Sequence, residues 1–112
     1  MPRRFRNGLA GLVQGWKRER SLRTQLVLSL VALLVMLAAH VRFPWFMAVV
    51  ALLAIALAAE LVNGAIEALL DRIHPGFDEE IGAAKDMSSA AVLIVNLAAG
   101  AAFVIALVAS LS

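Results

Sequence analysis

The sequence predicts an all-α membrane protein with three transmembrane helices and an N-terminal amphipathic surface helix. Hydrophobic residues make up 62% of the 112 residues and the mean hydropathy is +0.89, whereas ordinary globular domains are about 45–50% apolar. Three apolar segments each approach the roughly 20 residues that a helix needs to cross a bilayer. Most of the ten basic residues precede the first of these segments. Together these observations favour an integral membrane protein whose apolar surface is buried in the lipid bilayer.

The first expected element is a surface helix over residues 4–21. Its apolar residues recur at spacings of three and four with polar residues between them, which is typical of a helix lying in a membrane interface. They are Phe5, Leu9, Leu12, Val13 and Trp16. A cleavable signal peptide would also place positive charge before an apolar stretch. We reject cleavage because a long patterned segment precedes that stretch and two further spans follow it.

The three spans are expected over residues 24–41, 43–70 and 88–111. They are predicted as helices because backbone groups in lipid must find hydrogen bonds within their own segment. The second span has a cytoplasmic extension and leads into a charged loop over residues 71–86. The distribution of Lys and Arg near the membrane ends predicts a cytoplasmic N-terminus and loop. The turn at Arg42 and the C-terminus are then outside.

The basic leader and the absence of certain motifs exclude several classes of protein. A short basic segment beside apolar spans is explained more simply by anionic lipid headgroups than by nucleic acid, so we expect no nucleic-acid partner. The chain contains no cysteine, which excludes a disulfide framework and a thiolate metal site. It also lacks a Walker-type glycine-rich loop and the protein-kinase signature set. A soluble-type kinase is therefore excluded.

Four polar residues follow the apolar run of the second span. They are Glu60, Asn63, Glu67 and Asp71, here called the acidic stripe. At about 100° per residue they fall within an arc of about 80° on one helix face. A carboxylate within a membrane helix costs at least ~2.5 kcal/mol and is usually partnered or functional. The alternative is a solvated helix face, which stays open for Asp71. For Glu60 and Glu67 the other faces of the helix stay apolar, which favours acids that point inward.

Inward-facing acids at a membrane surface predict a divalent cation, because carboxylates together with phosphate oxygens are the usual ligands of Mg²⁺. Glu19, at the junction of the surface helix and the first span, is a further candidate ligand. Lys85 and Asp86 combine a cation that can offset phosphate charge with a second carboxylate. The alternatives are a surface ion pair for Glu19 and an exposed loop end or helix cap for Lys85 and Asp86. Asn96 is a candidate for hydrogen bonding to a neighbouring helix or to substrate.

Two segments resemble the signature of the small bacterial membrane diacylglycerol kinases. One is Glu60-Leu-Val-Asn63-Gly-Ala-Ile-Glu67-Ala-Leu-Leu-Asp71, and the other is Ala84-Lys85-Asp86-Met-Ser-Ser89-Ala-Ala-Val. The leader is also similar to the family's amphipathic leader. The resemblance implies a homotrimer in the bacterial cytoplasmic (inner) membrane, with active sites between subunits near the cytoplasmic face. One departure is Gly64, which stands where the family often has a small hydroxyl residue.

The resemblance also implies roles for individual residues. Glu60 resembles the catalytic base, Glu19 and Glu67 the metal-binding acids, and Asn63 and Lys85 the residues that arrange the phosphates. Ser89 is expected near the lipid substrate, together with Glu60. The residues implied for ATP are Asn7, Glu19, Glu67, Asp71, Gly76, Phe77, Asp78, Lys85 and Asp86. Asp78 departs from the family, in which a His is common at that position.

The expected function is ATP-dependent phosphorylation of diacylglycerol to phosphatidic acid, with Mg²⁺ as cofactor. The segment from Glu19 to Arg23 is also reminiscent of relatives that phosphorylate undecaprenol, so an undecaprenol kinase stays open. The alternative from another class is a non-enzymatic membrane module in which the acidic stripe stores or conducts cations. Lys85, Asp86 and the charged loop favour the kinase, because a simple cation path does not need them.

Overall fold

The computed structural model describes residues 2–76 and 78–111, and within these ranges the chain forms four helices. They are α1 (Arg3–Arg18), α2 (Arg20–Ala38), α3 (Phe43–Ile73) and α4 (Glu79–Ser110). Helices α2, α3 and α4 are long and apolar enough to cross a membrane. The predicted all-helical class and the three candidate spans are confirmed.

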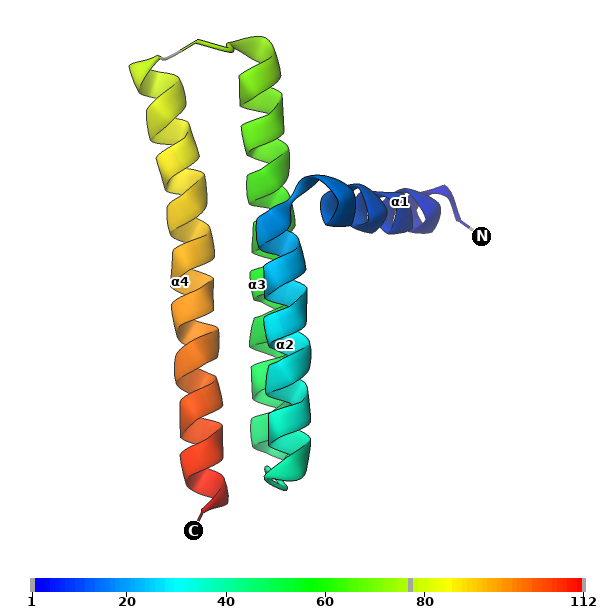
Figure 1. The fold of residues 1–112 in the computed structure, drawn as a ribbon, viewed down its shortest axis with the longest axis vertical. Helices are drawn as coiled ribbons and strands as arrows, with labels where there is room; N and C mark the ends of the chain where they lie inside the picture. The colour runs from blue at the N-terminus through cyan, green and yellow to red at the C-terminus, as the bar shows by residue number, and fades with distance from the viewer. Residues whose placement is uncertain (1, 77, 112) are drawn as a thin grey trace.

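The three long helices run side by side, and α1 projects crosswise from the bundle (Figure 1). Helices α3 and α4 make the most extensive pairing, while α2 packs mainly against α3. The loop between α3 and α4 lies at one end of the bundle. Helix α1 meets the bundle well below that loop (Figure 1). The upper parts of α3 and α4 therefore extend past the level of α1.

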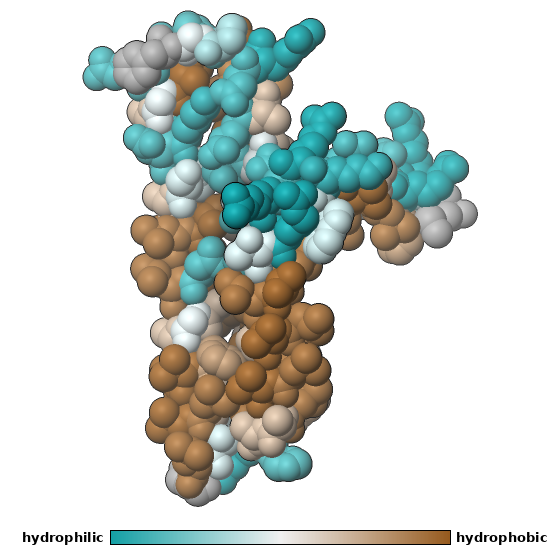
Figure 2. Space-filling view, in the orientation of Figure 1, coloured by the Kyte–Doolittle hydropathy of each residue, from teal (hydrophilic) through white to brown (hydrophobic). Residues whose placement is uncertain are grey.

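The packed core lies toward the end of the bundle remote from the α3–α4 loop. Met36, Val49 and Ala106 are fully buried there, and Phe46 and Phe103 pack against them. Most other large apolar side chains of the bundle are exposed. Exposed apolar surface on this scale marks a membrane or protein contact. Figure 2 shows it as a hydrophobic band over the lower bundle, with hydrophilic residues gathered over the upper ends of α3 and α4 and over α1.

The α1–α2 corner is a single extended residue. Glu19 has φ −109° and ψ 106°, and its N–H still donates to the Gly15 carbonyl at 2.8 Å. Arg23 Nη1 donates to the Trp16 carbonyl at 2.8 Å, where a cation complements the C-terminal end of a helix dipole. The first helix therefore ends at Arg18 instead of residue 21, and the second begins at Arg20 instead of residue 24. The placement of α1 on a membrane surface stays a prediction.

The predicted loop over residues 71–86 is wrong in its bounds. Helix α3 continues to Ile73 and α4 begins at Glu79. Asp78 explains the early start of α4, because its Oδ1 accepts hydrogen bonds from the backbone N–H groups of Glu80 at 2.9 Å and Ile81 at 3.2 Å. Such a side-chain cap satisfies donors that have no partner within the helix. Lys85 therefore belongs to α4 and not to a loop.

Candidate active site

Glu60 lies inside the bundle and is a buried charged residue, with only 7% of its surface exposed. It follows a long apolar run on α3, and the side chain of Ser21 on α2 faces its carboxylate. Glu60 also lines a cleft of about 420 Å³ with Asn96 of α4. The remaining lining residues are Arg20, Ser21, Thr24 and Gln25 of α2. A buried carboxylate thus faces a cavity that opens between helices, as predicted for the inward side of the acidic stripe.

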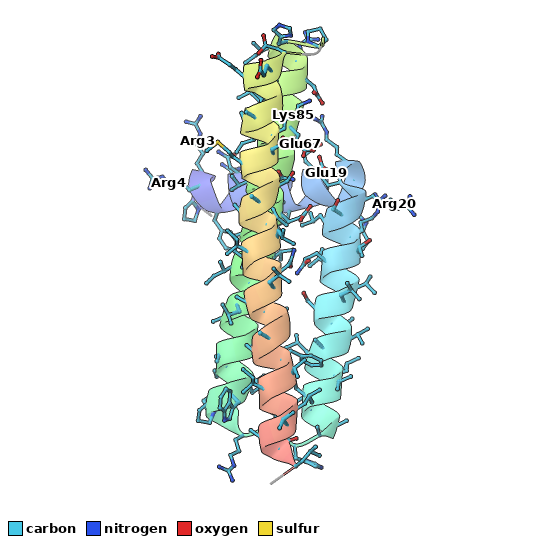
Figure 3. All side chains as sticks on the ribbon, turned by 90° about the vertical axis from the view of Figure 1, so that its left-hand side faces the viewer. Arg3, Arg4, Glu19, Arg20, Glu67 and Lys85 are labelled. Atoms are coloured by element: carbon cyan, nitrogen blue, oxygen red, sulfur yellow. The ribbon has the colours of Figure 1, made fainter. Side chains whose placement is uncertain are left out.

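Three carboxylates gather at the level of the α1–α2 corner. Those of Glu19 and Glu67 lie close enough to Glu60 for their negative charges to repel its own. Glu19 reaches the site from the corner, and its carboxyl group lies against the backbone of Gly64 on α3. Figure 3 shows Glu67 a little above Glu19, both on the upper part of the bundle. A bound cation would offset the repulsion among these like charges.

Asn63 links the carboxylates on α3 to α4. Its Nδ2 donates to Glu67 Oε1 at 3.4 Å, and its Oδ1 accepts a hydrogen bond from Ser88 Oγ at 2.6 Å. These two contacts fix which way the amide faces. Sequence reasoning missed Ser88, although its spacing of three residues from Lys85 places both on one face of α4. This spacing could have identified Ser88 as a residue of the site.

Lys85 forms an ion pair with Asp71 across the seam between α3 and α4. Its Nζ donates to Asp71 Oδ1, while the Asp71 side chain is well exposed. Asp71 is four residues beyond Glu67, so this pair continues the acidic stripe by one helical turn. An exposed pair of this kind contributes at most about 1 kcal/mol. Lys85 therefore keeps the freedom to exchange Asp71 for another anion.

The structure does not gather all the residues expected at the nucleotide. Asn7 is exposed on α1, and Asp86 and Ser89 are exposed on α4. Gly76 and Asp78 lie at the tip of the bundle, where Asp78 caps α4. Phe77 falls outside the described residues. Ser89 is also absent from the cleft beside Glu60, where Asn96 takes part instead.

The donor chemistry of the gathered residues fits Mg²⁺ brought by a nucleotide. Within residues 2–76 and 78–111, no group of three or more His, Cys, Asp or Glu side chains is placed so that it could hold a metal ion by itself. Mg²⁺ is commonly bound through one or two carboxylates together with substrate phosphates and water. Glu19 and Glu67 offer that kind of partial ligand set.

A groove of about 350 Å³ adjoins Glu19 between α1 and α3. Small residues line it on both helices: Gly8, Gly11 and Gly15 on α1, and Gly64, Ala65 and Ala68 on α3. Leu12, Gln14, Arg18, Glu19 and Leu61 complete the lining. The groove provides open space directly beside one of the three carboxylates.

Comparison with known proteins connects this arrangement to lipid phosphorylation. The family model of prokaryotic diacylglycerol kinases matches residues 6–109. The chain is 35% identical over 89 residues to the diacylglycerol kinase of Escherichia coli strain K12, covering 80% of this chain and 73% of that protein. The diacylglycerol kinase of Shigella flexneri matches with the same identity and coverage.

Proposed function

Since the chain belongs to the prokaryotic diacylglycerol kinase family, we propose that it transfers the γ-phosphoryl group of ATP to the free hydroxyl of diacylglycerol. In this reaction a bond forms between the lipid oxygen and the γ-phosphorus, and the bond from that phosphorus to the ADP oxygen breaks. The products are phosphatidic acid, ADP and one proton. The observation that carries the proposal is the burial of Glu60 beside two further carboxylates where the apolar band of the bundle ends.

Glu60 is the proposed general base. A base must lie within hydrogen-bonding reach of the hydroxyl whose proton it takes. The cleft beside Glu60 gives a lipid headgroup access to this carboxylate from between α2 and α4. Exposed apolar side chains further down both helices, such as Leu28 and Leu97, offer contacts to acyl chains. A lipid alcohol can thus reach Glu60 without leaving the bilayer.

The phosphates belong beside Glu19, Glu67, Asn63 and Lys85. Glu19 and Glu67 would hold Mg²⁺, which when bound offsets phosphate charge and orients the transferring group. Asn63 is held by Ser88 and directs its amide toward Glu67. Lys85 would exchange Asp71 for a phosphate oxygen, and its charge would then stabilise the transferring group. The main contribution of these residues is therefore to position the phosphates and to neutralise their charge, which is how phosphoryl transfer is usually catalysed.

The remaining nucleotide contacts are proposed for residues nearer the tip and on α1: Asn7, Asp71, Gly76, Asp78 and Asp86. Phe77, which lies outside the described residues, is proposed for the same role from the family resemblance. Several of these are exposed in a single protomer. A site shared between subunits would bring them to the nucleotide, in keeping with the proposed homotrimer. The broad apolar surface of the three spans leaves room for such contacts.

The proposed location is the bacterial cytoplasmic membrane, with the N-terminus and the α3–α4 loop in the cytoplasm and the C-terminus outside. Arg and Lys residues concentrate in α1 and at the start of α2, and such residues favour the cytoplasmic side. In this orientation the acidic stripe lies at the face where ATP is present.

The decisive experiment follows radiolabelled phosphate from ATP into lipid with detergent-purified protein, offering diacylglycerol and undecaprenol side by side. Wild-type protein is expected to label diacylglycerol and to require Mg²⁺. Preferential labelling of undecaprenol would assign the chain to the other lipid. Failure to label any lipid or to consume ATP would instead favour a non-enzymatic membrane module.

The role of Glu60 is tested by Glu60→Gln with Glu79→Gln as the matched control, because Glu79 is an exposed acid in the first turn of α4. Glu60→Gln is expected to bind ATP and assemble normally but to lose turnover by about 10²-fold or more. Glu79→Gln should stay near the wild-type rate. Near-normal turnover of Glu60→Gln would remove Glu60 from the role of base.

A further inference from the structure

Gly64 is a buried glycine in the interior of a long helix. Such a glycine destabilises a helix by about 1 kcal/mol relative to alanine. It lies four residues after Glu60 and three before Glu67, so all three residues share one face of α3. Because glycine has no side chain, the surface of α3 between Glu60 and Glu67 is bare backbone.

The space above Gly64 is filled by Glu19. A Cβ atom placed on Gly64 would lie 3.0 Å from Glu19 Cδ, 3.0 Å from Cγ and 3.1 Å from Oε1. These three nearest atoms all belong to the same carboxyl-bearing side chain. The Glu19 carboxyl group thus rests on the bare backbone of α3, between Glu60 and Glu67.

The other end of Glu19 has little freedom to withdraw. Its backbone N–H is bonded to Gly15, and Gly15 itself packs closely enough that an added Cβ would lie 2.6 Å from Leu22 Cδ2 and 2.7 Å from Leu61 Cδ2. The α1–α2 corner is therefore held against α3. A side chain added at Gly64 would displace the Glu19 carboxylate rather than the helices.

We propose that Gly64 is a positioning residue, whose missing side chain lets the Glu19 carboxylate lie between Glu60 and Glu67. This inference rests on the proposed function, in which Glu19 and Glu67 hold Mg²⁺. Mg²⁺ requires near-ideal octahedral geometry, so a displacement of a few tenths of an ångström in one ligand weakens binding. Gly64 thereby acts on the metal through Glu19 without touching metal or substrate.

The first test is Gly64→Ala, compared with Gly100→Ala in α4. Gly100 is the matched control because a Cβ there meets no atom within 4 Å, so both changes raise helix propensity but only one disturbs Glu19. Gly64→Ala is expected to weaken Mg²⁺ binding by roughly tenfold, measured both as the Mg²⁺ concentration for half-maximal activity and directly by calorimetric titration of the protein with Mg²⁺. The KM for lipid should not change. An unchanged Mg²⁺ requirement would overturn the proposal.

Gly64→Ser separates positioning from packing. Serine is larger than alanine, so a packing effect alone predicts a greater loss. If the position of the carboxylate matters, the serine hydroxyl can donate to Glu19 and return part of the Mg²⁺ affinity. A greater defect in Gly64→Ser than in Gly64→Ala would overturn the proposal, as would unfolding of both variants, which would make Gly64 a packing residue.

The wild-type assay keeps this inference distinct from the proposed function. A wild-type protein that phosphorylates no lipid refutes the kinase. If the wild type is active but Gly64→Ala and Gly100→Ala show the same Mg²⁺ dependence, only the positioning role of Gly64 is refuted.

Discussion

Lys85 of α4 donates a hydrogen bond to Asp71 of α3, and this ion pair joins the two longest helices just above the carboxylate cluster. Figure 3 shows Lys85 above Glu67 and Glu19 on the upper bundle. In the proposed reaction Lys85 leaves Asp71 for a phosphate oxygen. The pair therefore holds the cation near its destination before the nucleotide arrives.

Replacing Lys85 with methionine is expected to reduce phosphate transfer by about 10²-fold or more, because the Lys85 cation is proposed to stabilise the charge on the transferring group. Asp71→Asn should have a much smaller effect on turnover, since it leaves Lys85 charged. Steady-state phosphate transfer measures both variants. Equal losses in the two would indicate that the ion pair itself, and not the Lys85 charge on phosphate, is what activity needs.

Ser88→Ala is expected to raise the KM for ATP several-fold, because Asn63 loses the hydrogen bond that orients its amide and a net bond of this kind is worth about 1 kcal/mol. Ser89→Ala is the matched neighbour, since Ser89 is exposed. The role near lipid that the family resemblance implies for Ser89 predicts that only the KM for lipid responds to its loss. An ATP defect in Ser89→Ala but not in Ser88→Ala would contradict the assignment.

Asp78→Ala is expected to destabilise the start of α4 by about 1 kcal/mol, because two backbone N–H groups lose their side-chain acceptor. Hydrogen exchange at the Glu80 and Ile81 amides should become faster. Asp78→Asn keeps a capping oxygen and should retain most of the protection. Unchanged exchange in Asp78→Ala would show that this cap does not stabilise the helix end.

His40→Val is expected to destabilise the turn between α2 and α3, because His40 has φ 55° and a β-branched residue is strongly disfavoured there. The expected loss is about 1–2 kcal/mol, measured as a lower midpoint of thermal unfolding in detergent. His40→Gly should be tolerated. Turnover per folded molecule should be unchanged, since this turn lies at the end of the bundle remote from Glu60; a selective loss of turnover would contradict that separation.

Removal of divalent cations with a chelator is expected to abolish transfer, and added Mg²⁺ should restore it. Glu19→Gln and Glu67→Gln should each require more Mg²⁺, because each removes one proposed carboxylate ligand. Activity is read across a Mg²⁺ titration. A normal Mg²⁺ requirement in both variants would exclude these two residues as the metal site.

Much of the architecture follows from local pattern. The apolar runs predicted three long helices, and all three are present. The acidic stripe was predicted from its spacing to share one helix face; Glu60 is buried, whereas the Asp71 side chain at the other end of the stripe is exposed. The bounds were less accurate: the predicted loop over residues 71–86 ignored the capping power of Asp78, which starts α4 well before Lys85. The charged segment from Glu79 to Asp86 was interpreted as part of a loop, whereas it forms the polar first turns of α4.

The sequence by itself determined the membrane class, the helices and the common face of the acidic stripe, because hydrophobicity and helical periodicity act between residues close along the chain. Only the tertiary structure decided that Glu19 rests on Gly64, that Ser88 orients Asn63 and that Lys85 pairs with Asp71. Those contacts join different helices. They depend on the corner at Glu19 and on how each helix is rotated about its axis, which no local pattern specifies.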